Sequence, residues 1–123
     1  MSAKVAIVLV GALLVAAAPA GGATVRIRAT DDDRWDPARR KVARGTTVVW
    51  RNPTDAVHDV EIWKSPVGRI VVDDLLEPGE TAKRRLRKKG VYKYRCRVHS
   101  AVFRENGKRV CRGMCGTVRA GAS

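Results

Sequence analysis

The chain has 123 residues, 45% of them hydrophobic, and a formal net charge of +13. This length suits one domain with a small core, and nothing in the sequence indicates a second. The sequence has no C-x-x-C-H motif, which excludes covalently attached haem, and no C-x-x-C pair of the kind that structural zinc sites favour.

Residues 1–20 read as a signal peptide. Lys4 precedes an apolar run that ends at small residues, Ala18 and Ala20, in the A-x-A pattern of a cleavage site. An uncleaved anchor is the alternative, although the run is shorter than the ~20 residues that span a bilayer. We therefore expect an extracytoplasmic protein, secreted or held in the periplasm or cell envelope, with one domain over residues 24–120.

The rest of the chain reads as short strands separated by Gly, Pro, Asn and Asp. In chain order, the predicted strands are residues 24–30, 46–50, 58–63, 69–72, 81–87, 92–98 and 116–120. No segment in this part shows helical periodicity. Seven to eight short strands with frequent turns predict an all-β fold, a Greek-key β-sandwich.

Alternation along two of these strands predicts which side chains face the core. In residues 58–63, His58 shares a face with Val60 and Ile62, whereas Asp59 points to solvent. In "VYKYRCRV", Cys96 and Val98 lie on the inward face with both tyrosines, and the three basic residues between them point to water.

The positive charge is concentrated in one stretch. Residues 81–112 hold thirteen basic residues and one acidic residue, whereas residues 21–80 are nearly neutral. Such a stretch, including "KRRLRKK" at 83–89, suits an acidic redox partner or an anionic cell envelope, or serves only solubility. An extracytoplasmic location makes nucleic acid the least favoured partner, and we expect a monomer.

The scarce donor side chains point to metal chemistry. The chain contains two histidines, His58 and His99, and three cysteines, of which an odd one remains if two pair. Together with Cys96 and Met114, the histidines form the His2Cys set with a weak thioether that blue-copper sites use. Taken singly, an inward histidine, cysteine or methionine is more often a packing residue.

Four segments resemble the cupredoxins, the blue copper proteins of the plastocyanin and azurin type. "RWDPARRKVARGTTVVWRN" is similar to the first pattern of that family, and "HDV" to its first ligand strand. "LEPGETAKRRLRKKGVYKYRCRVH" and "GMCGTVRA" resemble its closing strands. The resemblance implies one type 1 copper ion bound by His58, Cys96, His99 and Met114, with the edge of His99 as the electron port.

The chain departs from this family between His99 and Met114. Fourteen residues intervene, and the "ENGK" within them predicts a projecting hairpin that leaves Met114 in place. Cys111 and Cys115 bracket the methionine, and we favour a disulfide between them. Free thiols, or one of these cysteines replacing Met114 as fourth ligand, are the alternatives.

The favoured function is one-electron transfer through Cu(I) and Cu(II), without enzymatic activity. One alternative is an extracytoplasmic protein that stores or delivers copper. Another is a basic β-sandwich that binds anionic polymers and retains a vestigial metal site.

Overall fold

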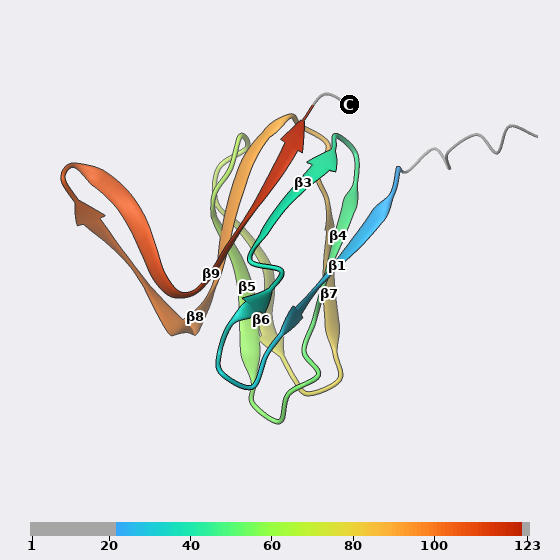
Figure 1. Cartoon of the computed structure of the whole chain (residues 1–123), viewed down its shortest axis with the longest axis vertical. Coiled ribbons are helices and arrows are strands. Elements are labelled where there is room, and N and C mark those ends of the chain that lie inside the picture. Colours follow the sequence, from blue (N-terminus) through green and yellow to red (C-terminus); the bar gives the residue numbers. More distant parts are fainter. Residues whose placement is uncertain (1–21, 122–123) are drawn as a thin grey trace, which may run out of the picture.

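The structure is a computed structural model that describes residues 22–121, so the predicted signal peptide lies outside the described residues. Within this range the chain forms nine strands (Figure 1). They are β1 (Thr24–Ala29), β2 (Trp35–Asp36), β3 (Arg39–Ala43), β4 (Thr47–Arg51), β5 (His58–Lys64), β6 (Ile70–Leu76), β7 (Thr81–Arg85), β8 (Gly90–Glu105) and β9 (Lys108–Gly121). No helix among the described residues is long and apolar enough to cross a membrane.

The strands form two sheets, in the orders β2-β1-β4-β7 and β3-β9-β8-β5-β6. Pairs β1–β4 and β3–β9 are parallel, and the other pairs are antiparallel. The predicted all-β sandwich is confirmed, with two more strands than the seven that we placed. The additional strands, β2 and β3, are edge strands with one neighbour each, and β3 is too exposed to show alternation.

The core between the sheets is built around aromatic rings. Tyr94 contacts Trp50 and Trp35 edge to face, with ring centroids 5.3 and 5.9 Å apart. Gly116 on β9 lies directly against Tyr94, since a Cβ there would come within 2.1 Å of the ring. Cys96 follows Tyr94 on the same inward face and is fully buried, as alternation predicted.

Ion pairs cover part of the outer face of the five-stranded sheet. Glu61 is 3% exposed, and its carboxylate accepts hydrogen bonds from Arg69 at 2.7 Å and Arg95 at 3.0 Å. Arg97 covers Asp59 in the same way, with Nε 2.5 Å from Oδ2. The sequence prediction that these basic side chains point freely to water is therefore wrong for Arg95 and Arg97, which neutralise buried carboxylates.

The donor residues and the 83–89 cluster lie toward opposite ends of the sandwich. At one end, Arg51, the last residue of β4, pairs with Thr81, the first residue of β7, and the chain continues from there through Asn52 to His58. The opposite end of β7 continues into the basic residues 85–89, beside Gly45. The cluster at 83–89 therefore extends toward the end of the sandwich away from His58.

We predict that Glu61→Gln lowers the free energy of unfolding by about 1–3 kcal/mol at pH 7, the usual contribution of hydrogen bonds to a charged group. Burial alone would raise the pKa of Glu61, but the hydrogen bonds from Arg69 and Arg95 outweigh it and lower that pKa. A lowered carboxyl pKa stabilises the fold above the ordinary value and loses this effect as pH falls through the folded-state value. Urea unfolding at several pH values should show the difference from wild type shrinking below about pH 4.

Glu77→Gln, at an exposed position, is the matched control and should change stability by less than about 0.5 kcal/mol. An equal loss for Glu61→Gln at pH 3 and pH 7 would contradict the assigned role of the ion pairs.

Candidate metal centre

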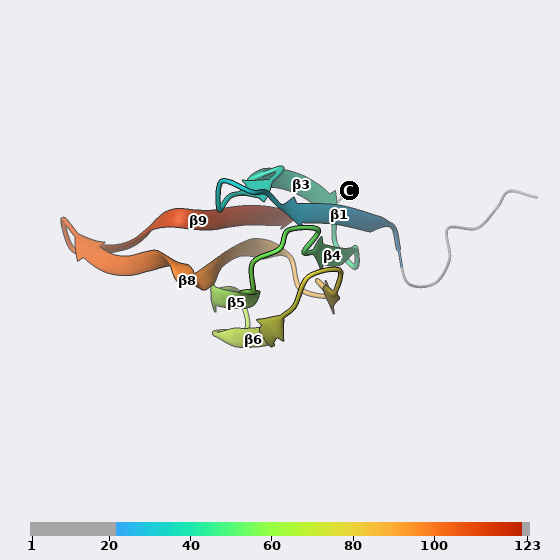
Figure 2. The ribbon, with the colours of Figure 1, turned by 90° about the horizontal axis from the view of Figure 1, so that it is seen from below.

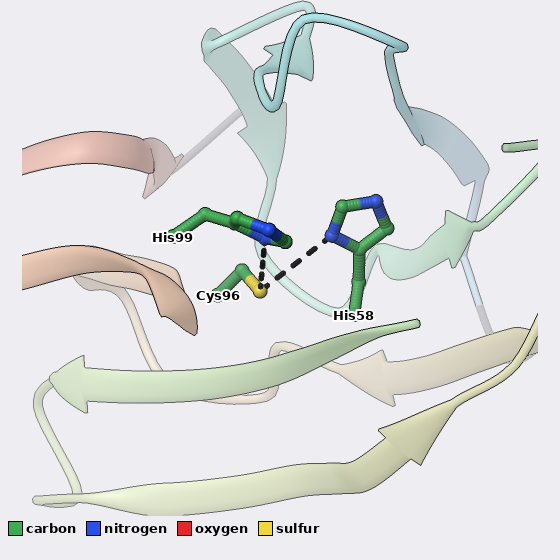
Figure 3. A group of neighbouring side chains, drawn as sticks. All are labelled: His58, Cys96 and His99. Atoms are coloured by element: carbon green, nitrogen blue, oxygen red, sulfur yellow. Dashed lines mark hydrogen bonds between the residues drawn. The ribbon is translucent and has the colours of Figure 1, made fainter. Parts of the chain in front are cut away.

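Three donor side chains converge at one end of the core (Figure 3). The Sγ atom of Cys96 lies 3.7 Å from Nδ1 of His58 and 3.6 Å from Nδ1 of His99. His58 and Cys96 are fully buried, whereas the side chain of His99 is 25% exposed. The three donor atoms lie within 4.8 Å of one another, so one ion could contact all three.

A break in strand pairing brings these residues together. Arg95 pairs with Cys115 and Ser100 pairs with Gly113, so residues 96–99 of β8 face a single residue of β9, Met114. This bulge ends the strict alternation after Cys96 and allows His99 to turn toward the same point. It also corrects one prediction, because Val98, which we expected inside, is 70% exposed.

Met114 is fully buried and belongs to the same core as Cys96. The residue before it, Gly113, has a φ of +100°, and a Cβ at this position would lie 2.3 Å from the carbonyl oxygen of His99. Glycine is therefore required where β9 passes closest to the His99 backbone. The insert forms a paired hairpin, as predicted, and Met114 lies opposite the bulge. Cys111 and Cys115 form a disulfide.

That disulfide settles the alternatives for the two outer cysteines. Both sulfurs are consumed by the Cys111–Cys115 bond, so neither supplies a thiolate to the centre. Cys96 is the remaining cysteine of the chain, and its thiol is free and buried. The predicted pairing is confirmed.

A polar clamp at the end of β4 holds the loop that leads to His58. The Asn52 amide donates to the carbonyls of Ala56 and Leu76, at 2.7 and 2.8 Å. Its oxygen accepts from the backbone N–H of Thr54 at 3.1 Å and from the Thr54 hydroxyl at 2.7 Å. Asn52 is fully buried, so this network fixes the backbone just before the ligand strand.

The same network selects the tautomer of His58. Nε2 of His58 lies 3.1 Å from the Thr54 hydroxyl oxygen. Because that hydroxyl gives its one hydrogen to Asn52, it accepts from His58, and Nε2 carries the imidazole hydrogen. Nδ1 then faces Cys96 with a free lone pair, which is the form needed to bind a metal.

Asp59 ties the His58 strand to the segment between Cys96 and His99. Its carboxylate accepts from the backbone N–H and from Nε of Arg97, each at 2.5 Å. The residue is 4% exposed, so our expectation that Asp59 points to solvent is wrong. Arg97 supplies the compensating charge that makes its burial possible.

The surroundings favour the neutral forms of His58 and Cys96 in the metal-free protein. Burial lowers the pKa of His58, and the neighbouring His99 lowers it further. Burial also raises the pKa of the Cys96 thiol, although the backbone N–H groups of Asp59 and Val98 act against this by donating to sulfur. Metal binding would therefore displace the thiol proton, while the neutral form of His58 is ready to coordinate.

His99 connects the buried donors to the surface. Its ring lies 5.0 Å from that of His58, between centroids, and its Nε2 is 3.6 Å from a carboxylate oxygen of Asp33. Sequence reasoning found the three convergent donors but missed Thr54 and Asp33. The "NPTD" turn before His58 was the available signal for Thr54, because threonine in such turns often binds nearby backbone and side chains.

The donor set fits a soft metal ion. Sulfur-to-nitrogen separations of 3.6 and 3.7 Å are those of ligands on one ion with bonds of about 2.0–2.3 Å, as in zinc sites with the same donor types. Two imidazoles and one thiolate, with a buried thioether nearby, match the His2Cys and methionine composition of blue-copper sites. The donor types and the separations of His58, Cys96 and His99 therefore fit type 1 copper.

Comparison with solved structures shows the same fold. An oxidized amicyanin mutant is 16% identical, with a TM-score of 0.62 over 79% of this chain and 81% of that chain. A second oxidized amicyanin mutant is 20% identical, with a TM-score of 0.61 over 85% and 87%. A copper-containing nitrite reductase from Thermus scotoductus is 21% identical, with a TM-score of 0.63 over 83% of this chain and 23% of the reductase.

The sequence also matches a protein family, described as copper binding proteins of the plastocyanin/azurin family, over residues 23–108. The match includes His58, Cys96 and His99 and ends before Met114. The chain therefore belongs to the plastocyanin/azurin family of copper-binding proteins, and its cofactor is one type 1 copper ion.

Proposed function

We propose that this protein is an extracytoplasmic one-electron carrier that exchanges electrons with a redox partner protein and has no enzymatic activity. Bound copper supplies the Cu(I)/Cu(II) couple. His58, Cys96 and His99 are its strong ligands, and Met114 is the weak fourth ligand. The observation that carries the proposal is the convergence of two imidazoles and one thiol, with His58 and Cys96 buried and His99 partly exposed.

Met114 is proposed as the fourth ligand from its place in the strand register. It is the one residue of β9 opposite the bulge that contains Cys96 and His99, and its side chain is fully buried. A thioether there adds only a weak, uncharged donor and excludes water, so it stabilises Cu(II) less than a stronger donor or a bound water would. The disulfide at Cys111–Cys115 removes the competing donors on either side.

The surrounding chain holds the donors in fixed positions. Asn52 anchors the loop before His58, Thr54 orients the His58 ring, and Asp59 ties β5 to the Cys96–His99 segment. A donor set that is held in this way changes little between oxidation states, so little reorganisation opposes electron transfer. Rigid, buried donors also favour a carrier over rapid delivery of the ion to another protein.

His99 is the proposed route for the electron. Its partly exposed ring reaches from Cys96 to the surface, whereas His58 is sealed inside. The side chains of Val98 and Val57, next to the two histidines, are 70% and 42% exposed and give this end an apolar rim. A partner that docks over His99 can therefore approach the donors without opening the fold.

An enzyme would need an open coordination position and space for a substrate. The burial of His58, Cys96 and Met114 instead encloses the centre in side chains.

We propose that residues 24–120 form the single domain, and that residues 1–20 direct it out of the cytoplasm as a cleaved signal peptide. The Cys111–Cys115 disulfide suits an oxidising compartment.

We predict that Cys96→Ser abolishes the intense visible absorption of the Cu(II)-loaded protein, because the thiolate is the donor responsible for it. The double variant Cys111→Ser/Cys115→Ser should keep the colour, since its sulfurs are not ligands. Titration of each purified protein with Cu(II) under a spectrophotometer provides the measurement. Colour in Cys96→Ser, or its loss in the double variant, would overturn the assigned ligand set.

Met114→Leu should keep the colour and raise the reduction potential. Leucine fills a similar volume but removes a donor that stabilises Cu(II). We expect a rise of about 60 mV or more, which is a tenfold change in the ratio of the two oxidation states. Redox titration of the copper-loaded proteins measures the reduction potential, and Val98→Ala, at an exposed position, is the control. An unchanged potential in Met114→Leu would exclude the methionine as ligand.

Thr54→Val should weaken Cu(I) binding by about 10- to 100-fold, the usual effect of removing a hydrogen bond behind a ligand. Valine keeps the shape but cannot accept from Nε2 of His58. Thr54→Ser restores the hydroxyl and should bind nearly as tightly as wild type. Competition with a coloured Cu(I) chelator measures both affinities, and equal affinities of the two variants would contradict the role assigned to the hydroxyl.

A further inference from the structure

Beyond the metal centre, β8 and β9 continue as a two-stranded hairpin, which we call the arm (residues 100–113). Figures 1 and 2 both show the arm running out to one side of the sandwich. It is paired from Ser100–Gly113 to Glu105–Lys108, and it turns at Asn106 and Gly107, both with positive φ. None of its residues belongs to the core described within residues 22–121, and most of them are exposed.

The arm is basic. It carries Arg104, Lys108, Arg109 and Arg112 against one acidic residue, Glu105. Arg112 pairs with Glu105 at 3.0 Å and lies over the ring of Phe103, whose exposed fraction is 38%. The net charge of the arm is therefore positive, and the Arg112 guanidinium is held against neighbouring side chains.

A groove lies where the arm joins the five-stranded sheet. Four cations line it, Arg34, Arg39, Lys93 and Arg112, together with Trp63 and the Cys111–Cys115 disulfide. No acidic side chain lines this groove in the described part of the chain. Like charges that are gathered around one concave surface raise the local positive potential and attract anions.

Two basic side chains lie over the ring of Trp63, which lines the groove. Lys93 Nζ lies 5.6 Å from the centroid of the Trp63 ring, and the Arg109 guanidinium carbon lies 5.1 Å from it. The ring is only 4% exposed, so the two cations cover it. Cation–π contacts of this kind hold the basic side chains at the groove without neutralising their charge.

The groove is adjacent to the metal centre. Its lining includes Gly113, Cys115 and Gly116, the residues of β9 that flank Met114. Gly113 also touches the backbone of His99. By contrast, the cluster at 83–89 extends toward the opposite end of the sandwich, so the cations best placed beside the electron port are those at the base of the arm.

We propose that the groove at the base of the arm is the docking site for an acidic surface of the redox partner. Carboxylates of the partner would pair with Arg34 and Arg39, which can each bind a carboxylate through two N–H groups. The arm would then lie along the partner and hold it beside His99. This inference rests on the proposed electron transfer, and it adds the chemistry of the partner and the surface that receives it.

The test uses two variants that each remove four positive charges. The groove variant is Arg34→Gln/Arg39→Gln/Lys93→Gln/Arg112→Gln. The matched control is Lys83→Gln/Arg84→Gln/Arg87→Gln/Lys88→Gln, in which all four positions are exposed and belong to the 83–89 cluster. Equal circular dichroism and equal visible spectra establish that both variants fold and load copper as wild type does.

The first measurement is the affinity for a deca-glutamate peptide, taken on the metal-free protein at 50 mM salt. We expect the groove variant to bind at least tenfold more weakly and the control less than threefold. The second is the rate of oxidation of the reduced protein by hexacyanoferrate(III) at the same salt. We expect the groove variant to be about fivefold slower and the control to change less than twofold, because charges beyond the ~14 Å Debye length act weakly.

Equal losses in the two variants, in either measurement, would overturn the proposal. So would loss of peptide binding with an unchanged rate of oxidation, which would indicate a site for an anionic envelope polymer instead. Failure of the proposed function has a separate signature, because wild-type protein would then show neither colour nor oxidation while peptide binding could still be measured.

Discussion

The structure depends on one interruption in the pairing of β8 with β9. Because residues 96–99 face Met114 alone, the chain departs from alternation where Cys96 and His99 must both turn inward. The bulge thus places a thiol and an imidazole 3.6 Å apart and exposes Val98 between them. Gly113 permits it, since no side chain fits between β9 and the carbonyl of His99 at that point.

Buried polar side chains around the metal centre hold the bulge and the neighbouring loop in position. Asp59 accepts two hydrogen bonds from Arg97 and so fixes the bulge to the first residues of β5. Asn52 and Thr54 fix the loop before β5 and leave Nδ1 of His58 facing the sulfur. Each of these side chains is a buried polar group with its partners present, which is how a polar network adds rigidity rather than strain. The arm extends from the same two strands, so β8 and β9 position both the metal centre and the proposed docking surface.

Much of this arrangement could be predicted from residue patterns. Strand alternation placed His58 and Cys96 inside, and the Asn-Gly turn predicted the hairpin after His99. Alternation failed at Val98, because a period-2 pattern does not indicate where a bulge interrupts it. It also failed at Asp59 and Arg97, since a buried ion pair on an outer face resembles two solvated charges in sequence. The Thr54 contact joins two nearby residues through a loop, so the strand pattern does not indicate it, and the "NPTD" turn was its only signal.

The central claim is that the chain holds one sulfur and two nitrogens in a geometry that suits both oxidation states of copper. X-ray absorption spectroscopy of the copper-loaded protein, recorded as Cu(II) and again after reduction, tests it most directly. We expect one short sulfur distance and two nitrogen distances in both states, with bond lengths that change little on reduction. A spectrum without the sulfur, or a loss of either nitrogen on reduction, would contradict the account.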